Sequence, residues 1–248
     1  MLNCRHQPAR FSLSGSGAPA ERLGLLQFKT TMKRTRIYID GYNLYYGLLK
    51  GTKDKWLDLE RFSKELLASD HEILTINFFT SIITPYPYDR ESIENQNIYL
   101  QALGANPLIK VVKGRYYRRT THLPPASKGC LDCDELHNGY VRVFKFEEKQ
   151  SDVNLAVLAV HDAALDLAET FVFVTGDSDQ VGTIHSIRKD FGKQVMVFNP
   201  HESPCLELKM AATYYRSIPR DLPARCQLPD AISVGARGNF IRRPAVWR

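Results

Sequence analysis

The 248-residue sequence lacks a long apolar run, an even set of cysteines and a Gly-x-Gly-x-x-Gly motif after its first predicted strand. Its longest apolar stretches, such as residues 155–160, fall far short of the roughly 20 residues that a membrane-spanning helix needs. The first thirty residues show no continuous apolar core of the secretory type. Five cysteines cannot all pair within the chain, which favours a reducing, cytoplasmic location. The missing glycine motif argues against a dinucleotide enzyme, because those glycines cradle the pyrophosphate.

Positive charge is concentrated at the two ends of the chain. The formal net charge is +6, with seven Lys or Arg and one acid in residues 1–36, and seven Arg and two Asp in residues 216–248. The residues between these ends therefore carry an excess of acids. Such basic ends either hold a polyanion near an acidic domain or keep the chain in solution, and the sign of the charge does not separate the two.

Short β-branched and aromatic runs alternate with helical patterns from residue 36 onward. Strands are predicted at residues 36–40, 73–81, 109–116, 170–175 and 194–199, and helices at residues 58–67, 89–103, 152–167, 180–191 and 203–212. This alternation predicts an α/β domain over residues 36–217, built from βαβ units around a mostly parallel sheet of about five strands.

Three segments depart from this alternation. Residues 1–35 are expected to be a disordered basic extension, with Met32 as a candidate translation start. An insertion at about residues 117–139 contains Pro and Gly and is expected to return as a hairpin strand over residues 140–147. Residues 218–248 are expected to be a basic, flexible tail.

Four aspartates occupy positions that a parallel sheet would bring together. Asp40 directly follows the apolar run at residues 37–39, and Asp177 and Asp179 follow the apolar run at residues 171–174. Asp152 lies in the first turn of an apolar helix, where the helix dipole favours a carboxylate. Strand carboxyl ends and helix N-termini meet at one edge of such a sheet. Each aspartate alone also suits a helix cap or a turn, but their combination favours a site for Mg²⁺ or Mn²⁺, which prefer oxygen ligands.

Three sequence runs resemble the motifs of the NYN domain family, a branch of the PIN-like nuclease superfamily. They are IDGYN, EEKQSDVNLAV and VTGDSDQVG, and the resemblance covers about residues 36–217. By position, Asp40 and Asn43 match the first motif, Asp152 matches the acid of EK-x-x-DV, and Asp177 and Asp179 match the acids of GDSD. The resemblance implies a three-layer α/β/α, Rossmann-like fold and RNA, single-stranded or structured, as the usual substrate.

The predicted function is therefore metal-dependent hydrolysis of RNA, with one or two Mg²⁺ or Mn²⁺ ions activating water and stabilising charge at phosphorus. Asp40 and Asp177 are expected to be direct ligands, and Asp152 and Asp179 to bind directly or through water. Asn43 and Ser178 are expected to orient a phosphate oxygen or a coordinated water.

Two alternatives stay open. One is a non-catalytic RNA-binding or regulatory module that holds the same metal. The other is a phosphatase-like hydrolase of small phosphoesters, although its haloacid-dehalogenase form expects an acid where Tyr42 stands. Self-association is compatible with either function.

Residues 110–122, KVVKGRYYRRTTH, interleave basic residues with tyrosines. Arg115, Arg118 and Arg119 are candidates for contacts with RNA, although an exposed strand also carries such charges against aggregation. Lys149 is expected to touch phosphate or to pair with an acid. Glu147 and Glu148 are weaker candidates for the acidic site, and their favoured interpretation is as solvated charges at a strand end.

The insertion also contains a C-x-x-C-x-x-x-H pattern formed by Cys130, Cys133 and His137, with His122 nearby. These residue types and spacings predict a small structural Zn²⁺ site, with free thiols or a redox pair as the alternatives. Cys4, Cys205 and Cys226 show no pairing pattern and are expected to be free thiols.

Overall fold

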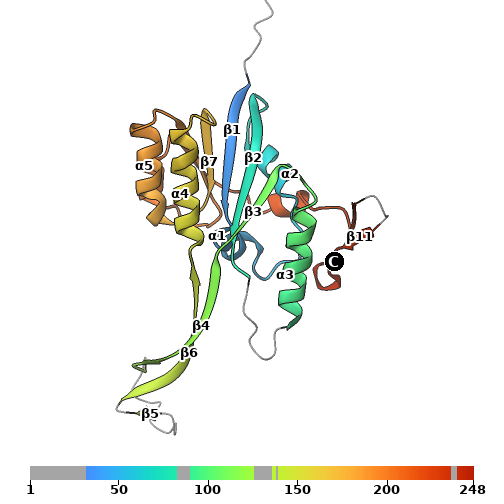
Figure 1. The fold of residues 1–248 in the computed structure, drawn as a ribbon, viewed down its shortest axis with the longest axis vertical. Coiled ribbons are helices and arrows are strands. Elements are labelled where there is room, and N and C mark those ends of the chain that lie inside the picture. The colour runs from blue at the N-terminus through green and yellow to red at the C-terminus, as the bar shows by residue number, and fades with distance from the viewer. Residues whose placement is uncertain (1–31, 83–89, 126–135, 138, 236–238) are drawn as a thin grey trace, which may run out of the picture. The chain divides into compact units, whose positions relative to one another are not determined.

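The computed structural model describes residues 32–82, 90–125, 136–137, 139–235 and 239–248. Its central feature is a six-stranded sheet in the order β3-β2-β1-β7-β8-β9, in which all neighbouring strands are parallel (Figure 1). The strands are β1 (Lys33–Asp40), β2 (His71–Thr80), β3 (Ile109–Lys113), β7 (Thr170–Val174), β8 (Gln194–Asn199) and β9 (Tyr214–Ser217). Four of the five predicted strands are confirmed as β1, β2, β7 and β8, and the first part of the strand predicted at residues 109–116 is confirmed as β3. The edge strand β9 is a sixth that the sequence analysis missed, because its four residues are too few to show a period.

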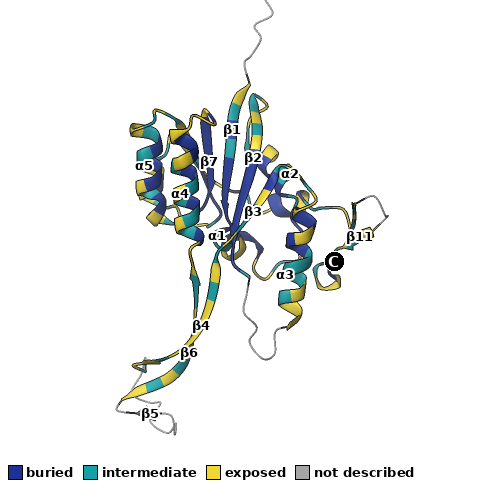
Figure 2. Ribbon diagram, viewed as in Figure 1, coloured by how far each residue is buried: buried dark blue, intermediate teal, exposed yellow. Residues whose placement is uncertain are grey.

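Helices pack against both faces of this sheet. One face is covered by α1 (Gly41–Leu44), the π-helix η1 (Tyr45–Leu49), α2 (Leu59–Leu66) and α3 (Arg90–Leu103), and the other by α4 (Ser151–Ala164), α5 (Val181–Lys189) and α6 (Leu206–Ala211). Ile37 and Ile39 of β1 enter the first core, whereas Tyr38 between them enters the second. All of β7 is buried (Figure 2). The predicted three-layer α/β/α architecture is confirmed.

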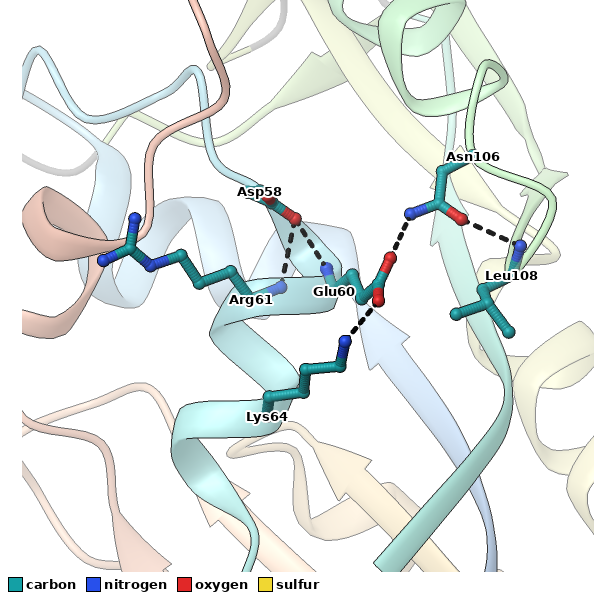
Figure 3. Close-up of polar contacts among 6 residues, drawn as sticks. All are labelled: Asp58, Glu60, Arg61, Lys64, Asn106 and Leu108. Atoms are coloured by element: carbon teal, nitrogen blue, oxygen red, sulfur yellow. Dashed lines mark hydrogen bonds and ion pairs between the residues drawn. The ribbon is translucent and has the colours of Figure 1, made fainter. Parts of the chain in front are cut away.

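The start of α2 shows how local sequence specifies a helix. The Asp58 carboxylate accepts hydrogen bonds from the backbone N–H groups of Glu60 and Arg61, both at 3.0 Å (Figure 3). The Glu60 carboxylate in turn accepts from Lys64 Nζ at 2.5 Å and from Asn106 Nδ2 at 2.6 Å. These bonds satisfy N–H groups that the first turn leaves without partners, and they join α2 to the loop before β3.

A second, three-stranded sheet leaves the first at Gly114. It contains β4 (Arg115–Leu123), β5 (Leu136–His137) and β6 (Tyr140–Lys149), with β6 between the other two. The strand predicted at residues 109–116 is therefore broken into β3 and β4. A Cβ atom on Gly114 would lie 2.6 Å from the hydroxyls of Ser81 and Ser151, so the chain passes there without room for a side chain. The predicted return strand is confirmed as β6, antiparallel to β4.

Residues 218–235 and 239–248 are ordered, and the prediction of a flexible tail is wrong for them. They form α7 (Leu222–Arg225), the antiparallel pair β10 (Ala231–Val234) and β11 (Asn239–Arg242), and the 3₁₀ helix η3 (Ala245–Trp247). Leu222 and Cys226 are buried in the first core, and the Trp247 ring lies 6.4 Å from Trp56 and 6.3 Å from Tyr99. These buried apolar residues are widely spaced in the sequence and separated by arginines, so they show no periodic pattern.

Cys205 and Cys226 are free thiols, as predicted. Residues 1–31, most of the disordered extension predicted over residues 1–35, lie outside the described residues, whereas residues 33–35 are the start of β1 and not part of an extension. In the part of the chain that is described, no helix combines the length and the apolarity needed to cross a bilayer.

Candidate functional site at the carboxyl edge of the sheet

The candidate site lies between the carboxyl ends of β1 and β7. These strands are neighbours, but the chain continues from β1 to β2 on one side and from β7 to β8 on the other. Helices connecting such strands lie on opposite faces, which leaves a crevice outside the carboxyl ends where ligands bind in open α/β sheets. Asp40 is the last residue of β1, and residues 175–177 directly follow β7.

Asp40 is held from several directions although it is almost fully buried. Its carboxylate accepts the Asn43 backbone N–H at 3.0 Å, Asn43 Nδ2 at 2.5 Å and the Thr175 hydroxyl at 3.2 Å. Burial raises the pKa of Asp40, the hydrogen bonds from Asn43 and Thr175 lower it, and the nearby charge of Asp177 raises it again. Burial of the charged Asp40 carboxylate is unfavourable, and the hydrogen bonds from Asn43 and Thr175 offset part of this desolvation cost.

Asn43 connects β1 to the loop after β7. Its Oδ1 accepts the Gly176 backbone N–H at 3.1 Å and lies 3.0 Å from His201 Nε2. Gly176 is required here, because a Cβ atom would lie 2.6 Å from both Asn199 Oδ1 and the His201 ring. Asn43 therefore positions the Asp40 carboxylate and the Gly176 backbone together.

Asp177 and Asp179 lie on the short turn after β7. Thr175 Oγ1 accepts the Asp177 N–H at 3.1 Å, and the Asp177 carboxylate accepts the Asp179 N–H at 3.0 Å, which caps the 3₁₀ helix η2 (Ser178–Gln180). Asp177, whose structural alternative was to stabilise a turn, therefore acts as the N-cap of η2. Ser178 and Asp179 are exposed to solvent at this edge.

Asp152 lies in the first turn of α4, as predicted, and faces the other acids. Burial, followed by the charges of Asp40, Glu148, Asp177 and Asp179, raises the pKa of Asp152 to about 6. The other three predicted aspartates therefore all act electrostatically on Asp152. The long-range arrangement expected from strand ends and a helix start is present around Asp152.

Glu148 is a fifth acid at this edge, and its interpretation as a solvated strand-end charge is wrong. Its Oε1 accepts the Ser81 hydroxyl at 2.9 Å and the Ser151 backbone N–H at 3.1 Å. Glu148 is half-buried and is among the charges that act on Asp152. A signal was present, since Glu148 is the first residue of the EK-x-x-DV run whose Asp is Asp152. Glu147, on the opposite side of β6, pairs with Lys145, Arg119 and Lys149 instead.

The negative charge at this edge is not neutralised by basic side chains of the described residues. No ion pair joins Lys, Arg or His there to Asp40, Glu148, Asp152, Asp177 or Asp179. Within the same residues, no group of three or more His, Cys, Asp or Glu side chains is set closely enough to hold one ion. The carboxylates are near enough to repel one another but do not form a closed ligand cluster. Their hard oxygen donors fit the chemistry of Mg²⁺ or Mn²⁺.

His201 is a polar residue of this site that the sequence analysis missed. It lies between Asn43 and a pocket of about 400 Å³ beside the acids. This pocket is lined by Tyr46, Gly47, Gly176, His201, Glu202, Ser203 and Arg220. A single histidine after a strand has no local pattern that would reveal such a contact.

The predicted RNA-contacting basic residues lie on the β4–β6 hairpin rather than among the acids. Arg119 and Lys149 both pair with Glu147, which confirms the acid-pairing role expected of Lys149. Arg118 stacks over the Phe144 ring at 5.3 Å, and Arg115 Nη1 donates to the Tyr117 hydroxyl at 3.4 Å.

The predicted Zn²⁺ site cannot be placed. Cys130 and Cys133 lie outside the described residues, and only the backbone of His137 is described.

The parallel sheet and the acids at its carboxyl edge define the class of protein, an α/β domain with a carboxylate-rich site. A family model described as the NYN domain matches residues 34–219. The chain therefore belongs to the NYN domain family.

A curated relative from Pseudomonas putida, 6-hydroxy-3-succinoylpyridine 3-monooxygenase HspA, is 34% identical over 227 residues, which span 80% of this chain and 71% of the relative. A solved structure of a protein of unknown function from Vibrio parahaemolyticus covers 77% of this chain and 96% of its own, with 18% identity and a TM-score of 0.48.

Proposed function

We propose that this protein is a metal-dependent ribonuclease that hydrolyses phosphodiester bonds at the carboxyl edge of its sheet. The observation that carries the proposal is that four acids act on Asp152 and that none of these five acids has a basic partner among the described residues. Keeping such charges together is costly unless a cation offsets them. Membership of the NYN domain family supports RNA as the substrate.

Each side chain has a role that follows from its position. Asp40, Asp152, Asp177, Asp179 and Glu148 would hold Mg²⁺ or Mn²⁺, directly or through water. When bound, such a cation supplies Lewis-acid stabilisation for attack of water on phosphorus. Asn43 keeps the Asp40 carboxylate in one orientation through two hydrogen bonds. The exposed Ser178 hydroxyl is available to donate to a phosphate oxygen.

The decisive experiment incubates the purified full chain with single-stranded RNA, hairpin RNA and DNA in Mn²⁺, Mg²⁺ or chelator. We expect RNA cleavage that requires the cation and is lost in Asp177→Asn. Glu72→Gln is the matched control, because Glu72 is an exposed acid near the opposite, amino end of β2. Cleavage that survives both chelator and Asp177→Asn would exclude this site. RNA binding without cleavage would instead identify a non-catalytic binding module.

The name of the Pseudomonas putida relative adds a second assay. Monooxygenation consumes O₂ and two electrons, so the protein is also incubated with 6-hydroxy-3-succinoylpyridine, air and a reductant. Hydroxylation of this compound without any cleavage of RNA would refute the ribonuclease proposal.

A further inference from the structure

The β4–β6 hairpin has two chemically different faces. In the antiparallel register Tyr116 lies opposite Glu148, Arg118 opposite Phe146 and Thr120 opposite Phe144, and paired residues share a face. We call the face formed by Tyr116, Arg118, Thr120, Phe144, Phe146 and Glu148 the Tyr116 face. The other, the Tyr117 face, contains Arg115, Tyr117, Arg119, Lys145, Glu147 and Lys149.

The Tyr116 face is continuous with the acidic site. Glu148, at its end, is held by Ser81 and by the first turn of α4. Burial raises the pKa of Tyr42, and the neighbouring Tyr116, Glu148 and Tyr46 raise it further. These three side chains therefore lie near the Tyr42 hydroxyl. The Tyr42 hydroxyl is buried there and has no hydrogen-bond partner within the described part of the chain. The Tyr42 and Tyr46 rings stack at 6.2 Å.

Aromatic rings continue along the Tyr116 face away from the acids. Tyr116 stacks on Phe146 with a centroid distance of 6.2 Å and an interplanar angle of 28°. Phe146 is 36% exposed and Phe144, which carries the Arg118 guanidinium at 5.3 Å, is 53% exposed. At about 3.4 Å per residue, the four steps from Glu148 to Phe144 extend roughly 14 Å.

The two faces also differ in whether their basic side chains lie beside an acid. On the Tyr117 face, Arg119, Lys145 and Lys149 surround the single acid Glu147. Within the described residues of β4 and β6, Glu148 is the sole acid on the Tyr116 face, and it belongs to the site itself. Arg118 is thus an aromatic-stacked cation on a surface that carries no acid beyond its site end.

We propose that the Tyr116 face binds the unpaired bases of a single-stranded RNA whose backbone continues to the acidic edge. The identity of the ligand rests on the proposed ribonuclease function. Exposed rings that alternate with an arginine offer stacking to any base, because every base has a π face. Bases within a duplex are already stacked and paired, so the same surface discriminates against double-stranded RNA.

The test measures binding of a labelled unstructured RNA by fluorescence anisotropy in chelator, where cleavage does not interfere. Phe144→Ala and Phe146→Ala should each raise Kd about tenfold to a hundredfold. Tyr117→Ala is the matched control, since Tyr117 is 45% exposed on the opposite face of the same hairpin, and it should leave Kd unchanged. Phe144→Tyr keeps an aromatic ring and should retain wild-type affinity, which separates stacking from damage to the hairpin.

Equal losses in Tyr117→Ala and Phe144→Ala would overturn the proposal, as would unchanged affinity in both Phe→Ala variants. Tight binding of duplex RNA, or of an apolar peptide in place of RNA, would also overturn it. The two proposals fail separately. Cleavage by the wild type with unchanged binding by the variants refutes the base-stacking face alone, whereas selective loss of binding without any cleavage by the wild type refutes the ribonuclease function alone.

Discussion

Asp152→Asn is expected to stabilise the cation-free protein, although it removes a carboxylate from the first turn of α4. The pKa of Asp152 is raised from 3.8 to about 6, by burial first and then by four neighbouring carboxylates. A difference of that size corresponds to about 3 kcal/mol between the charged and neutral forms. Asp152 is partly exposed, so solvent screening and the lost helix-dipole interaction reduce the net gain to about 1 kcal/mol.

This gain is measured by thermal unfolding in chelator at neutral pH and low salt. A gain of about 1 kcal/mol should raise Tm by roughly 2–4 °C in a chain of this length, and added salt should shrink it. In Mn²⁺ or Mg²⁺ the wild type should have the higher Tm. A cation at a hundred times its Kd stabilises the wild type by about 2.7 kcal/mol and the variant by less.

Glu72→Gln is again the control, since it removes one negative charge near the opposite end of the sheet. It should change neither the Tm in chelator nor the response to the cation. A lower Tm for Asp152→Asn in chelator would show that the carboxylate is there to cap α4. A full cation response in that variant would likewise contradict its place in the metal site.

Three further changes test other parts of the structure. Trp247→Ala should lower the free energy of unfolding by about 2 kcal/mol in a urea titration, because it removes a partly buried ring from two aromatic neighbours, whereas the exposed neighbour change Val246→Ala should have no effect. Asp58→Ala should cost about 1 kcal/mol in the same assay through loss of the α2 cap, and an unchanged midpoint would contradict that role. His201→Ala removes one partner of Asn43 and should weaken cation affinity and RNA cleavage about tenfold to a hundredfold with little change in Tm; a large loss of Tm would indicate a purely structural histidine.

Regular elements were predictable where the signal is local. The apolar runs of β1 and β7 and the polar-apolar period of α2 determine strand and helix without distant partners. The edge strand β9 and residues 218–248 were not predictable in this way. Their short or widely spaced apolar residues become ordered only by pairing with β8 or packing around Trp56.

The same distinction holds within the candidate site. Asp40 and Asp177 follow apolar strands directly, and Asp152 begins an apolar helix, so their approach to one edge follows from the parallel topology. Glu148 was interpreted as a solvated charge because the residues next to it in the sequence do not indicate a buried contact. Its contact with Ser81, 67 residues away, shows that it belongs to the site.

The sequence by itself determined the class of fold, the family motifs and the four aspartates at strand and helix ends, because each depends on residues within one strand or one turn. Only the tertiary structure decided that Glu148 joins them, that His201 supports Asn43 across 158 residues, and that Phe144 and Arg119 lie on opposite faces of one hairpin. Those facts depend on the register of β4 with β6 and on contacts between distant segments, about which local periodicity carries no information.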